Sequence, residues 1–331
     1  MKTRNGFLFQ FKPREWILAF VVVILSAQIV SAKPLEPLNL IQYLLRLNEL
    51  RYSSLDPKTV KLISTQYFQG CVIDETQFEV RDPVTNISHN LQVAIYRPAV
   101  SVKLPAVIII PTILGRTVIE NSVAYRFCMT NMVSVIADVN STAAPASLPD
   151  WEMHDRMNRS ALIDLRTLLD LLESHPQVDA KKIAGYGLSL GGFTMSLLAA
   201  VDSRIKAVAL IATAGNMPAI LTNSQQKFPV RLREMRMKAI NNTSLSAYED
   251  YLRANINYDP ILMARTPATS KYFMLMNLDD VYVPAENQLE LWSRLGNPEH
   301  LDVRASHDQT ILGAVTVHFN EILNAIVARL R

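Results

Sequence analysis

The chain has 331 residues, of which 49% are apolar and 19% charged, a globular composition sufficient for one large α/β domain. Its formal net charge of +3 arises at the start of the chain, where Lys2, Arg4, Lys12 and Arg14 outnumber Glu15. The remainder is therefore electrically neutral. A neutral remainder offers no excess of basic groups to a phosphate backbone, which argues against nucleic acid as a partner.

An uncharged apolar run at residues 16–25 follows these basic residues, and small residues then precede Lys33. This layout is typical of a secretory signal peptide, cleaved after Ala32, and assigns residues 1–32 to that signal. The run is shorter than the roughly 20 residues of a membrane span. We expect a secreted or periplasmic protein. The alternative is an uncleaved membrane anchor, because Val30 extends the apolar stretch.

Residues 33–67 are expected to form an N-terminal arm packed on the domain that follows. Residues 71–80 and 91–96 alternate apolar and polar side chains around a turn, which predicts an antiparallel hairpin at the edge of a sheet. The even cysteine count of an exported chain permits one disulfide between Cys71 and Cys128, and two buried thiols are an equal alternative.

Beyond this hairpin the pattern changes to strand, loop and helix. Largely apolar runs, typical of strands buried on both faces, lie at residues 106–110, 133–137, 182–186, 205–211 and 271–276, and residues 301–304 are predicted to form one more strand. Helices are predicted between and after them at residues 123–132, 162–172, 193–200, 286–295 and 311–330. The alternation predicts a mostly parallel, doubly wound α/β sheet with helices on both faces over residues 68–331.

One interval, about residues 214–265, has helical spacing and no strand pattern. We expect it to be a helical insertion that forms a lid over the strand ends, where open α/β sheets bind their ligands. The alternative is an ordinary long helical crossover.

Gly187-Leu188-Ser189-Leu190-Gly191 has the G-x-S-x-G pattern and lies between a buried strand and an apolar helix. In that setting the turn holds its central serine in a strained conformation, which requires small neighbours and exposes the hydroxyl. The free N–H groups of the helix N-terminus favour developing negative charge beside it. The motif predicts Ser189 as a nucleophile.

A serine hydroxyl needs a base to remove its proton, and the base needs a third group to hold its tautomer. Of the six histidines, His307 stands just after a predicted strand, in a loop at the sheet edge where Ser189 emerges. Two adjacent acids, Asp279 and Asp280, follow another buried strand. We prefer Asp280, four residues before Pro284 in an Asp-x-x-Val-Pro pattern, and leave Asp279 to cap or brace the turn.

The elbow, the Asp-x-x-Val-Pro pattern and the order serine, acid, histidine resemble the α/β-hydrolase superfamily over about residues 68–331, especially its dienelactone-hydrolase-like and bacterial exported esterase members. The resemblance implies an oxyanion site made by the N–H groups of Leu190 and of Ile113 or Thr112, with Ile113 preferred. The absence of a His-Gly-Gly loop argues against the hormone-sensitive-lipase branch. Dienelactone hydrolases proper use cysteine, so Ser189 indicates general ester chemistry.

The sequence therefore predicts an exported serine hydrolase, above all a carboxylesterase that cleaves small-molecule esters through an acyl-enzyme. Its triad is expected to be Ser189, Asp280 and His307, and no metal or cofactor is required. A peptidase or acyltransferase with the same triad is the alternative within enzymes. A catalytically silent hydrolase fold that serves as a binding module is the alternative outside them.

Overall fold

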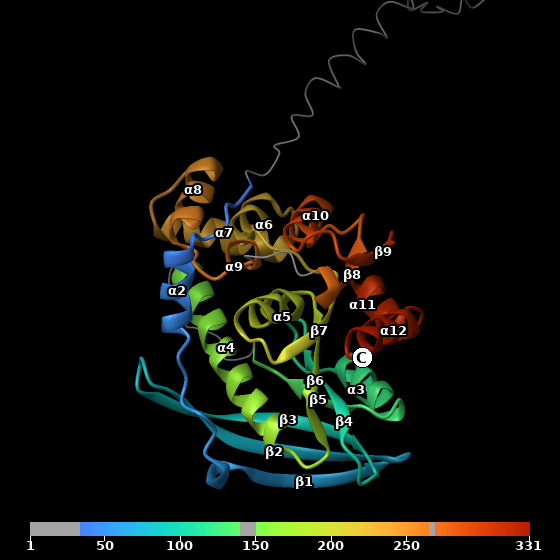
Figure 1. Ribbon diagram of the computed structural model, residues 1–331. Coiled ribbons are helices and arrows are strands. Elements are labelled where there is room, and N and C mark those ends of the chain that lie inside the picture. Colours follow the sequence, from blue (N-terminus) through green and yellow to red (C-terminus); the bar gives the residue numbers. More distant parts are fainter. Residues whose placement is uncertain (1–33, 140–149, 265–268) are drawn as a thin grey trace, which may run out of the picture. The chain divides into compact units, whose positions relative to one another are not determined.

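The computed structural model describes residues 34–139, 150–264 and 269–331, so the predicted signal peptide, residues 1–32, lies outside the described residues. The described residues form one sheet with the strand order β1-β2-β3-β5-β4-β6-β7-β8-β9 (Figure 1). Its strands are β1 (Lys61–Phe68), β2 (Cys71–Asp82), β3 (Ile87–Pro98), β4 (Leu104–Ile110), β5 (Val133–Ala137), β6 (Val178–Leu188), β7 (Ile205–Ile211), β8 (Tyr272–Asn277) and β9 (Glu299–Val303).

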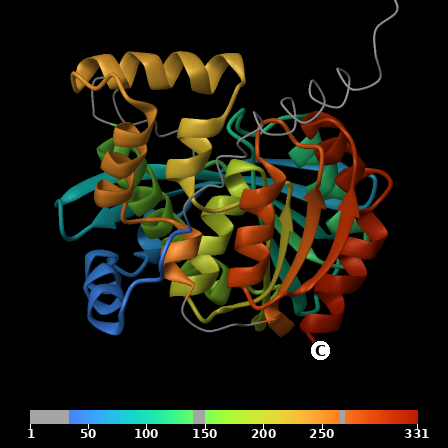
Figure 2. The ribbon, with the colours of Figure 1, turned by 90° about the horizontal axis from the view of Figure 1, so that it is seen from above.

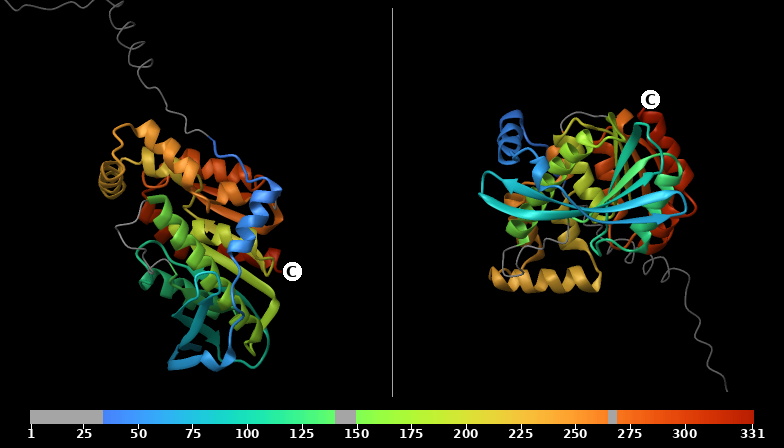
Figure 3. Two further views of the ribbon diagram at one scale, coloured as in Figure 1. Left: turned by 90° about the vertical axis from the view of Figure 1, so that its left-hand side faces the viewer. Right: turned by 90° about the horizontal axis from the view of Figure 1, so that it is seen from below.

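The sheet has an antiparallel part and a parallel part. β1, β2 and β3 pair antiparallel, and β3 joins the rest through antiparallel pairing with β5, where Val93 faces Ala137. The two long strands β2 and β3 form the twisted ribbon seen from below in Figure 3. From β5 to β9 every neighbouring pair is parallel, which confirms the predicted mostly parallel sheet.

Helices cover both faces of the sheet, as doubly wound folds require. α3, α11 and α12 contribute to the apolar core on one face, and α4, α5 and α10 to the core on the other. The helices are α2 (Leu40–Glu49), α3 (Val118–Met129), α4 (Asp150–Ser174), α5 (Leu190–Val201), α6 (Met217–Asn223), α7 (Lys227–Ala239), α8 (Leu245–Asn255), α9 (Pro260–Met263), α10 (Ala285–Arg294), α11 (His307–Val315) and α12 (Phe319–Arg329), with short 3₁₀ turns at Pro57–Thr59 and Thr269–Lys271.

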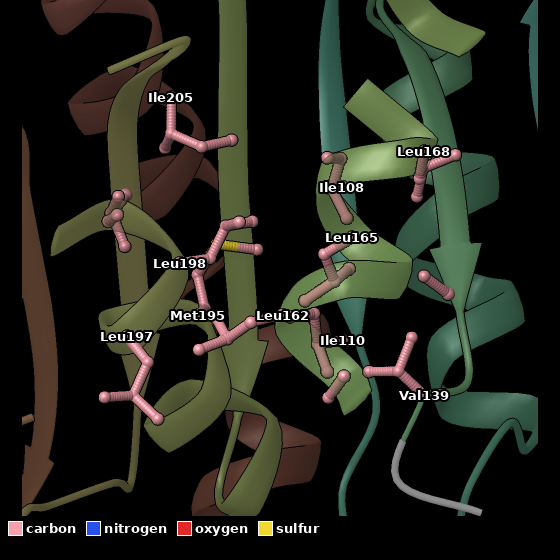
Figure 4. Packing of buried hydrophobic residues seen from close by; sticks show 14 of the residues in the cluster. Ile108, Ile110, Val139, Leu162, Leu165, Leu168, Met195, Leu197, Leu198 and Ile205 are labelled. Carbon is pink, nitrogen blue, oxygen red and sulfur yellow. The ribbon is translucent and has the colours of Figure 1, made fainter. Parts of the chain in front are cut away.

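β4 shows why the central strands read as continuous apolar runs. Ile108 and Ile110 point to the face covered by α4 and α5, where they pack among Leu165 and Met195 (Figure 4). The alternate residue Ile109 points to the opposite face, among side chains of α3, α11 and α12. Each such side chain is worth roughly 1.5–3 kcal/mol when fully buried, so these strands hold the two layers together.

Two elements differ from the sequence-based expectation. β1 was not predicted, because every one of its residues is exposed and its sequence therefore lacks the alternation of a half-buried strand. It pairs with β2, so the predicted hairpin of β2 and β3 is not the edge of the sheet. The single C-terminal helix expected at residues 311–330 is wrong. The chain forms α11 and α12 instead, because the first ends at its C-cap Thr316 and the second begins after His318.

The described part of the expected insertion, residues 214–264, contains the helices α6 to α9, joined by turns and without a strand. α6 and α8 share a small apolar cluster around Tyr248, Leu252 and Ile256, and α8 also contacts α4. These helices lie on the α4 side of the sheet, away from α11 and α12 (Figure 2). That the insertion closes over the site as a lid stays a prediction.

Cys71 and Cys128 are joined by a disulfide, which decides between the two alternatives that the sequence left open. The bond connects the first residue of β2 to the last turn of α3. Among the helices that the structure describes, none is by itself long and apolar enough to cross a membrane; the bent pair of α11 and α12 would qualify together by length and composition alone.

Candidate active site

Ser189 lies between the end of β6 and the first turn of α5, with φ +51° and ψ −115°. A non-glycine residue in this region costs about 1–3 kcal/mol and persists only where its surroundings enforce it. Two residues further on, α5 packs so closely on the end of β4 that a Cβ on Gly191 would lie 2.1 Å from the carbonyl oxygen of Ile110. The glycine therefore lets α5 begin against the end of β4, and the turn presents the Ser189 side chain at the carboxyl edge of the sheet.

The structure brings the three predicted side chains together at that edge. Ser189 follows β6, Asp280 follows β8 and His307 follows β9, all at carboxyl ends of parallel strands. The Nε2 atom of His307 lies 3.0 Å from the Ser189 hydroxyl, and its Nδ1 atom lies 2.6 Å from the Asp280 carboxylate. Because the carboxylate only accepts, Nδ1–H donates to it, and Nε2 is left as the acceptor for the serine proton.

The two adjacent acids have separate partners. The Asp280 side chain is fully buried, and its second oxygen accepts the N–H groups of Tyr282 and Val283 at 2.9 and 3.0 Å. The Asp279 side chain is half exposed and forms an ion pair with Arg304 at 2.6 Å. Asp280 is thus the acid that faces the histidine, whereas Asp279 braces the end of β8 against the end of β9.

His307 was expected in a loop, but it is the first residue of α11. Ser306 caps that helix and forms a capping box with Gln309, which fixes the direction in which the chain leaves β9. The histidine is therefore held by a helix start on its backbone side and by Asp280 on its ring side.

Asn277, the last residue of β8, is a positioning residue that sequence reasoning missed. Its side chain donates to the carbonyl of Ala305 at 2.9 Å and accepts from the N–H of Asp279 at 3.1 Å. Gln288 of α10 in turn pairs with both backbone groups of Asn277 at 3.0 and 2.9 Å. Asn277 and Gln288 are both fully buried, and they fix the acid loop relative to the histidine loop. The only sequence signal was a polar residue ending an apolar strand.

The loop after β4 lies beside Ser189, where the resemblance placed the second oxyanion donor. Gly115 N–H bonds to the Thr112 carbonyl at 3.0 Å, and the loop is held from below by Asp138, which accepts the N–H of Arg116 at 3.1 Å. Leu190 is the first residue of α5, so the helix itself provides no acceptor for its N–H. The roles of Leu190 and Ile113, with Thr112 as the alternative, stay predictions.

A pocket of about 490 Å³ opens at Ser189 and His307, a volume within the range of small-molecule sites. Its walls come from the loop after β4, the start of α3, the acid loop and α11, and they are mainly apolar. Tyr282, which the sequence analysis did not single out, lines it with its ring 5.5 Å from that of His307. None of the described residues of the insertion lines the pocket.

The remaining histidines lie elsewhere. His154 bonds to the carbonyl of Tyr258 at 2.9 Å, and His89 forms an ion pair with Asp164 of α4. His300 packs edge-to-face against Trp292. None of these three is among the residues that line the pocket.

A mostly parallel sheet wound on both sides, with a strained serine after one strand and its histidine and acid after two others, defines a serine hydrolase of the α/β-hydrolase superfamily. The model of the prolyl oligopeptidase family matches residues 125–309, more than half of the chain, and the protein belongs to that family.

Solved structures share the fold. The acetyl xylan esterase from Paenibacillus sp. R4 superposes with a TM-score of 0.67 at 15% identity, over 90% of this chain and 97% of that one. Acetyl xylan esterase 1 from Thermoanaerobacterium sp. JW/SL YS485 superposes with a TM-score of 0.63 at 16% identity, over 89% of this chain and 96% of that one. A Bradyrhizobium sp. protein named as a probable 2-oxo-3-(5-oxofuran-2-ylidene)propanoate lactonase is 31% identical over 118 residues, 33% of this chain and 46% of that protein. The chain thus spans about half the length of this curated relative.

Proposed function

We propose that the protein is an exported carboxylesterase in which Ser189 is the nucleophile, His307 the general base and Asp280 the residue that orients it. The observation that carries this proposal is the continuous chain of hydrogen bonds from Asp280 through His307 to Ser189 at the mouth of an apolar pocket. Fold likeness alone would not distinguish an active enzyme from a silent one, whereas this geometry is what proton transfer from serine requires.

In the first half-reaction, Nε2 of His307 takes the Ser189 proton while the hydroxyl oxygen attacks the ester carbonyl. Asp280 stabilises the resulting imidazolium through the Nδ1 bond of 2.6 Å. The N–H groups of Leu190 and Ile113 hold the oxyanion, an interaction worth about 3–4 kcal/mol per donor. The imidazolium then gives its proton to the leaving alcohol, and an acyl group remains on Ser189.

In the second half-reaction, water takes the place of the alcohol. His307 accepts a proton from the water as it attacks the acyl carbonyl, and it returns that proton to the serine oxygen as the acid leaves. Each step uses the same His307 nitrogen, so a single histidine orientation serves both halves.

Two observations support export. The N-terminal sequence has the layout of a signal peptide. The Cys71–Cys128 disulfide is the kind of bond that persists in oxidising compartments and is rare where thiols are kept reduced. Recovery of the full-length precursor in the cytoplasmic fraction, with none of the protein beyond the membrane, would contradict this part of the proposal.

Membership of the prolyl oligopeptidase family favours a second candidate, a peptidase that uses the same three residues. The two candidates share the acyl-enzyme and differ in the leaving group. A panel of short p-nitrophenyl esters and of aminoacyl p-nitroanilides separates them, because cleavage of the anilides without cleavage of the esters would favour the peptidase.

A fluorophosphonate probe tests the proposal directly. We expect the wild-type protein to be labelled, and Ser189→Ala to be neither labelled nor active on p-nitrophenyl butyrate. Ser122→Ala is the matched control, since this serine is exposed on α3 and bonds only to the Val118 carbonyl within the described chain. Absence of labelling in the folded wild-type protein would instead indicate a silent hydrolase fold.

A further inference from the structure

The charged groups of the pocket are unevenly distributed. Apart from His307, the described residues that line the pocket include two acids, Glu120 and Asp308, and no lysine or arginine. The Glu120 carboxylate is buried and accepts two hydrogen bonds from Thr117, one from the Thr117 backbone N–H at 2.8 Å and one from the Thr117 hydroxyl at 2.5 Å. Asp308 differs, because it is exposed in the first turn of α11 and its side chain has no hydrogen-bond partner among the described residues.

The arginines next to this pocket in the chain are already paired. Arg116, which follows the loop after β4, donates to Glu75 and to Asn121 at 2.7 Å each. Arg304, which precedes the histidine, forms its ion pair with Asp279. Both guanidinium groups are thus engaged by carboxylates of the protein, and neither arginine lines the pocket, whose exposed charged lining residue is Asp308.

Exposed apolar side chains line the same opening or adjoin its lining residues in the chain. Ile113 is 62% exposed and Leu114 80% exposed in the loop after β4, and Val118 is 78% exposed at the start of α3. Val281 and Leu312, on the acid loop and on α11, are also more than half exposed. Ile113 and Leu114 line the pocket, and Val118, Val281 and Leu312 are sequence neighbours of lining residues; exposed apolar groups gathered in this way are typical of a binding surface for an apolar ligand.

We propose that the pocket selects electrically neutral, apolar esters and discriminates against esters whose acyl part carries a carboxylate, with Asp308 as the residue that sets this preference. The inference rests on the proposed esterase function and names its substrate class. It also separates this chain from the probable lactonase to which it is similar, because that protein's name specifies a propanoate, a carboxylate-bearing group. A substrate carboxylate would meet Asp308 instead of a basic side chain.

The size of the expected discrimination follows from the repulsion between the Asp308 carboxylate and a substrate carboxylate, each of which carries one unit charge. At a separation of about 6 Å, in surroundings between bulk water and a protein surface, it corresponds to roughly a tenfold change in an equilibrium or rate ratio. Salt weakens it, because the Debye length shortens from about 30 Å at 0.01 M to about 3 Å at 1 M ionic strength.

The test compares methyl p-nitrophenyl adipate with p-nitrophenyl hydrogen adipate, whose acyl chains end in a neutral methyl ester and in a carboxylate, respectively. We expect the wild-type protein to hydrolyse the neutral ester with a kcat/KM at least roughly tenfold higher at low ionic strength. Asp308→Asn should reduce that ratio severalfold, and added salt should reduce the wild-type ratio in the same direction.

Glu321→Gln is the matched control, because Glu321 is likewise an exposed acid in the first turn of a helix, α12, and does not line the pocket. It should leave the ratio as in the wild type. Equal kcat/KM values for the two esters, or equal ratios in Asp308→Asn and Glu321→Gln, would overturn the inference while the esterase function stands. Failure to hydrolyse either ester would instead remove the proposed function.

Discussion

Replacing Asp280 by asparagine tests the proposed triad most sharply, because it changes one atom without changing the shape of the side chain. In the wild type one carboxylate oxygen accepts the N–H groups of Tyr282 and Val283, and the other accepts from His307. An asparagine has a single acceptor oxygen, and two backbone donors already converge on that position. The amide oxygen therefore stays with the backbone, and the NH₂ group faces the imidazole.

The histidine must then accept at Nδ1, so its proton moves to Nε2. The Nε2 atom that lies 3.0 Å from the Ser189 hydroxyl thereby becomes a donor and no longer removes the serine proton. Locking a triad histidine in this tautomer lowers kcat about 10⁴-fold, which corresponds to about 5.5 kcal/mol in the activation free energy. Both backbone hydrogen bonds of the acid loop survive, so the melting temperature should change little.

The assay is the steady-state hydrolysis of p-nitrophenyl butyrate, with thermal unfolding followed in parallel. Asp279→Asn is the matched control. The half-exposed ion pair of Asp279 with Arg304 contributes at most about 1 kcal/mol to the free energy of unfolding, and Asp279 does not contact the His307 ring, so its loss leaves the tautomer of His307 unchanged. We expect its kcat within about twofold of the wild type, because Asp280 and not Asp279 orients His307. Retention of a tenth or more of the wild-type kcat by Asp280→Asn would refute the reasoning, and so would equal losses in the two variants.

Three further predictions concern stability. Gly191→Ala should lower the melting temperature and abolish ester hydrolysis, because its Cβ would meet a backbone carbonyl oxygen at 2.1 Å. Gly313→Ala is the contrasting variant: it lies in a helix, and its Cβ would have only a side-chain atom at 3.6 Å, so thermal unfolding should show a gain in stability of up to about 1 kcal/mol. Removal of the disulfide in Cys71→Ala/Cys128→Ala, which closes a sequence separation of 57, should lower the free energy of unfolding by about 4 kcal/mol in urea while kcat/KM stays near wild type. Burial lowers the pKa of Lys271 to about 8. The unfolded chain, with a lysine pKa of about 10.4, then binds more protons between these values, so the wild-type protein should gain up to roughly 3 kcal/mol relative to Lys271→Met as the pH rises from 8 to 10.4, measured as unfolding free energy against pH.

The parallel part of the sheet was predictable because strands that are buried on both faces are apolar at nearly every position, which gives a recognisable run of apolar residues in the sequence. Residues such as Ile108 and Ile109 must both be apolar when each faces a helical layer. The same reasoning explains the failure at β1, whose side chains are all exposed and whose place in the sheet depends on backbone pairing with β2. Backbone pairing at an exposed edge leaves little trace in the sequence.

The break between α11 and α12 was missed for a related reason. Apolar spacing continues on both sides of it, with Ile311 and Ile322 buried in the same core, so the pattern reads as one long helix. The turn between them is set by local geometry at residues 316–318, where no proline or glycine marks the break in the sequence.

For the site, the sequence could name the strands after which the functional groups occur, but it could not orient them. Asp279 and Asp280 are chemically identical neighbours, and only the direction of the turn after β8 sends one toward His307 and the other toward Arg304. That direction depends on Asn277, which joins the acid loop to the histidine loop through contacts across 28 positions of the chain. A contact of this kind has no periodicity and no fixed spacing, so it becomes visible only when both loops are placed in space. Ser189 and Asp280 are therefore readable from local motifs and His307 from its place after a predicted strand, whereas the residues that make the proposed chemistry geometrically possible are not.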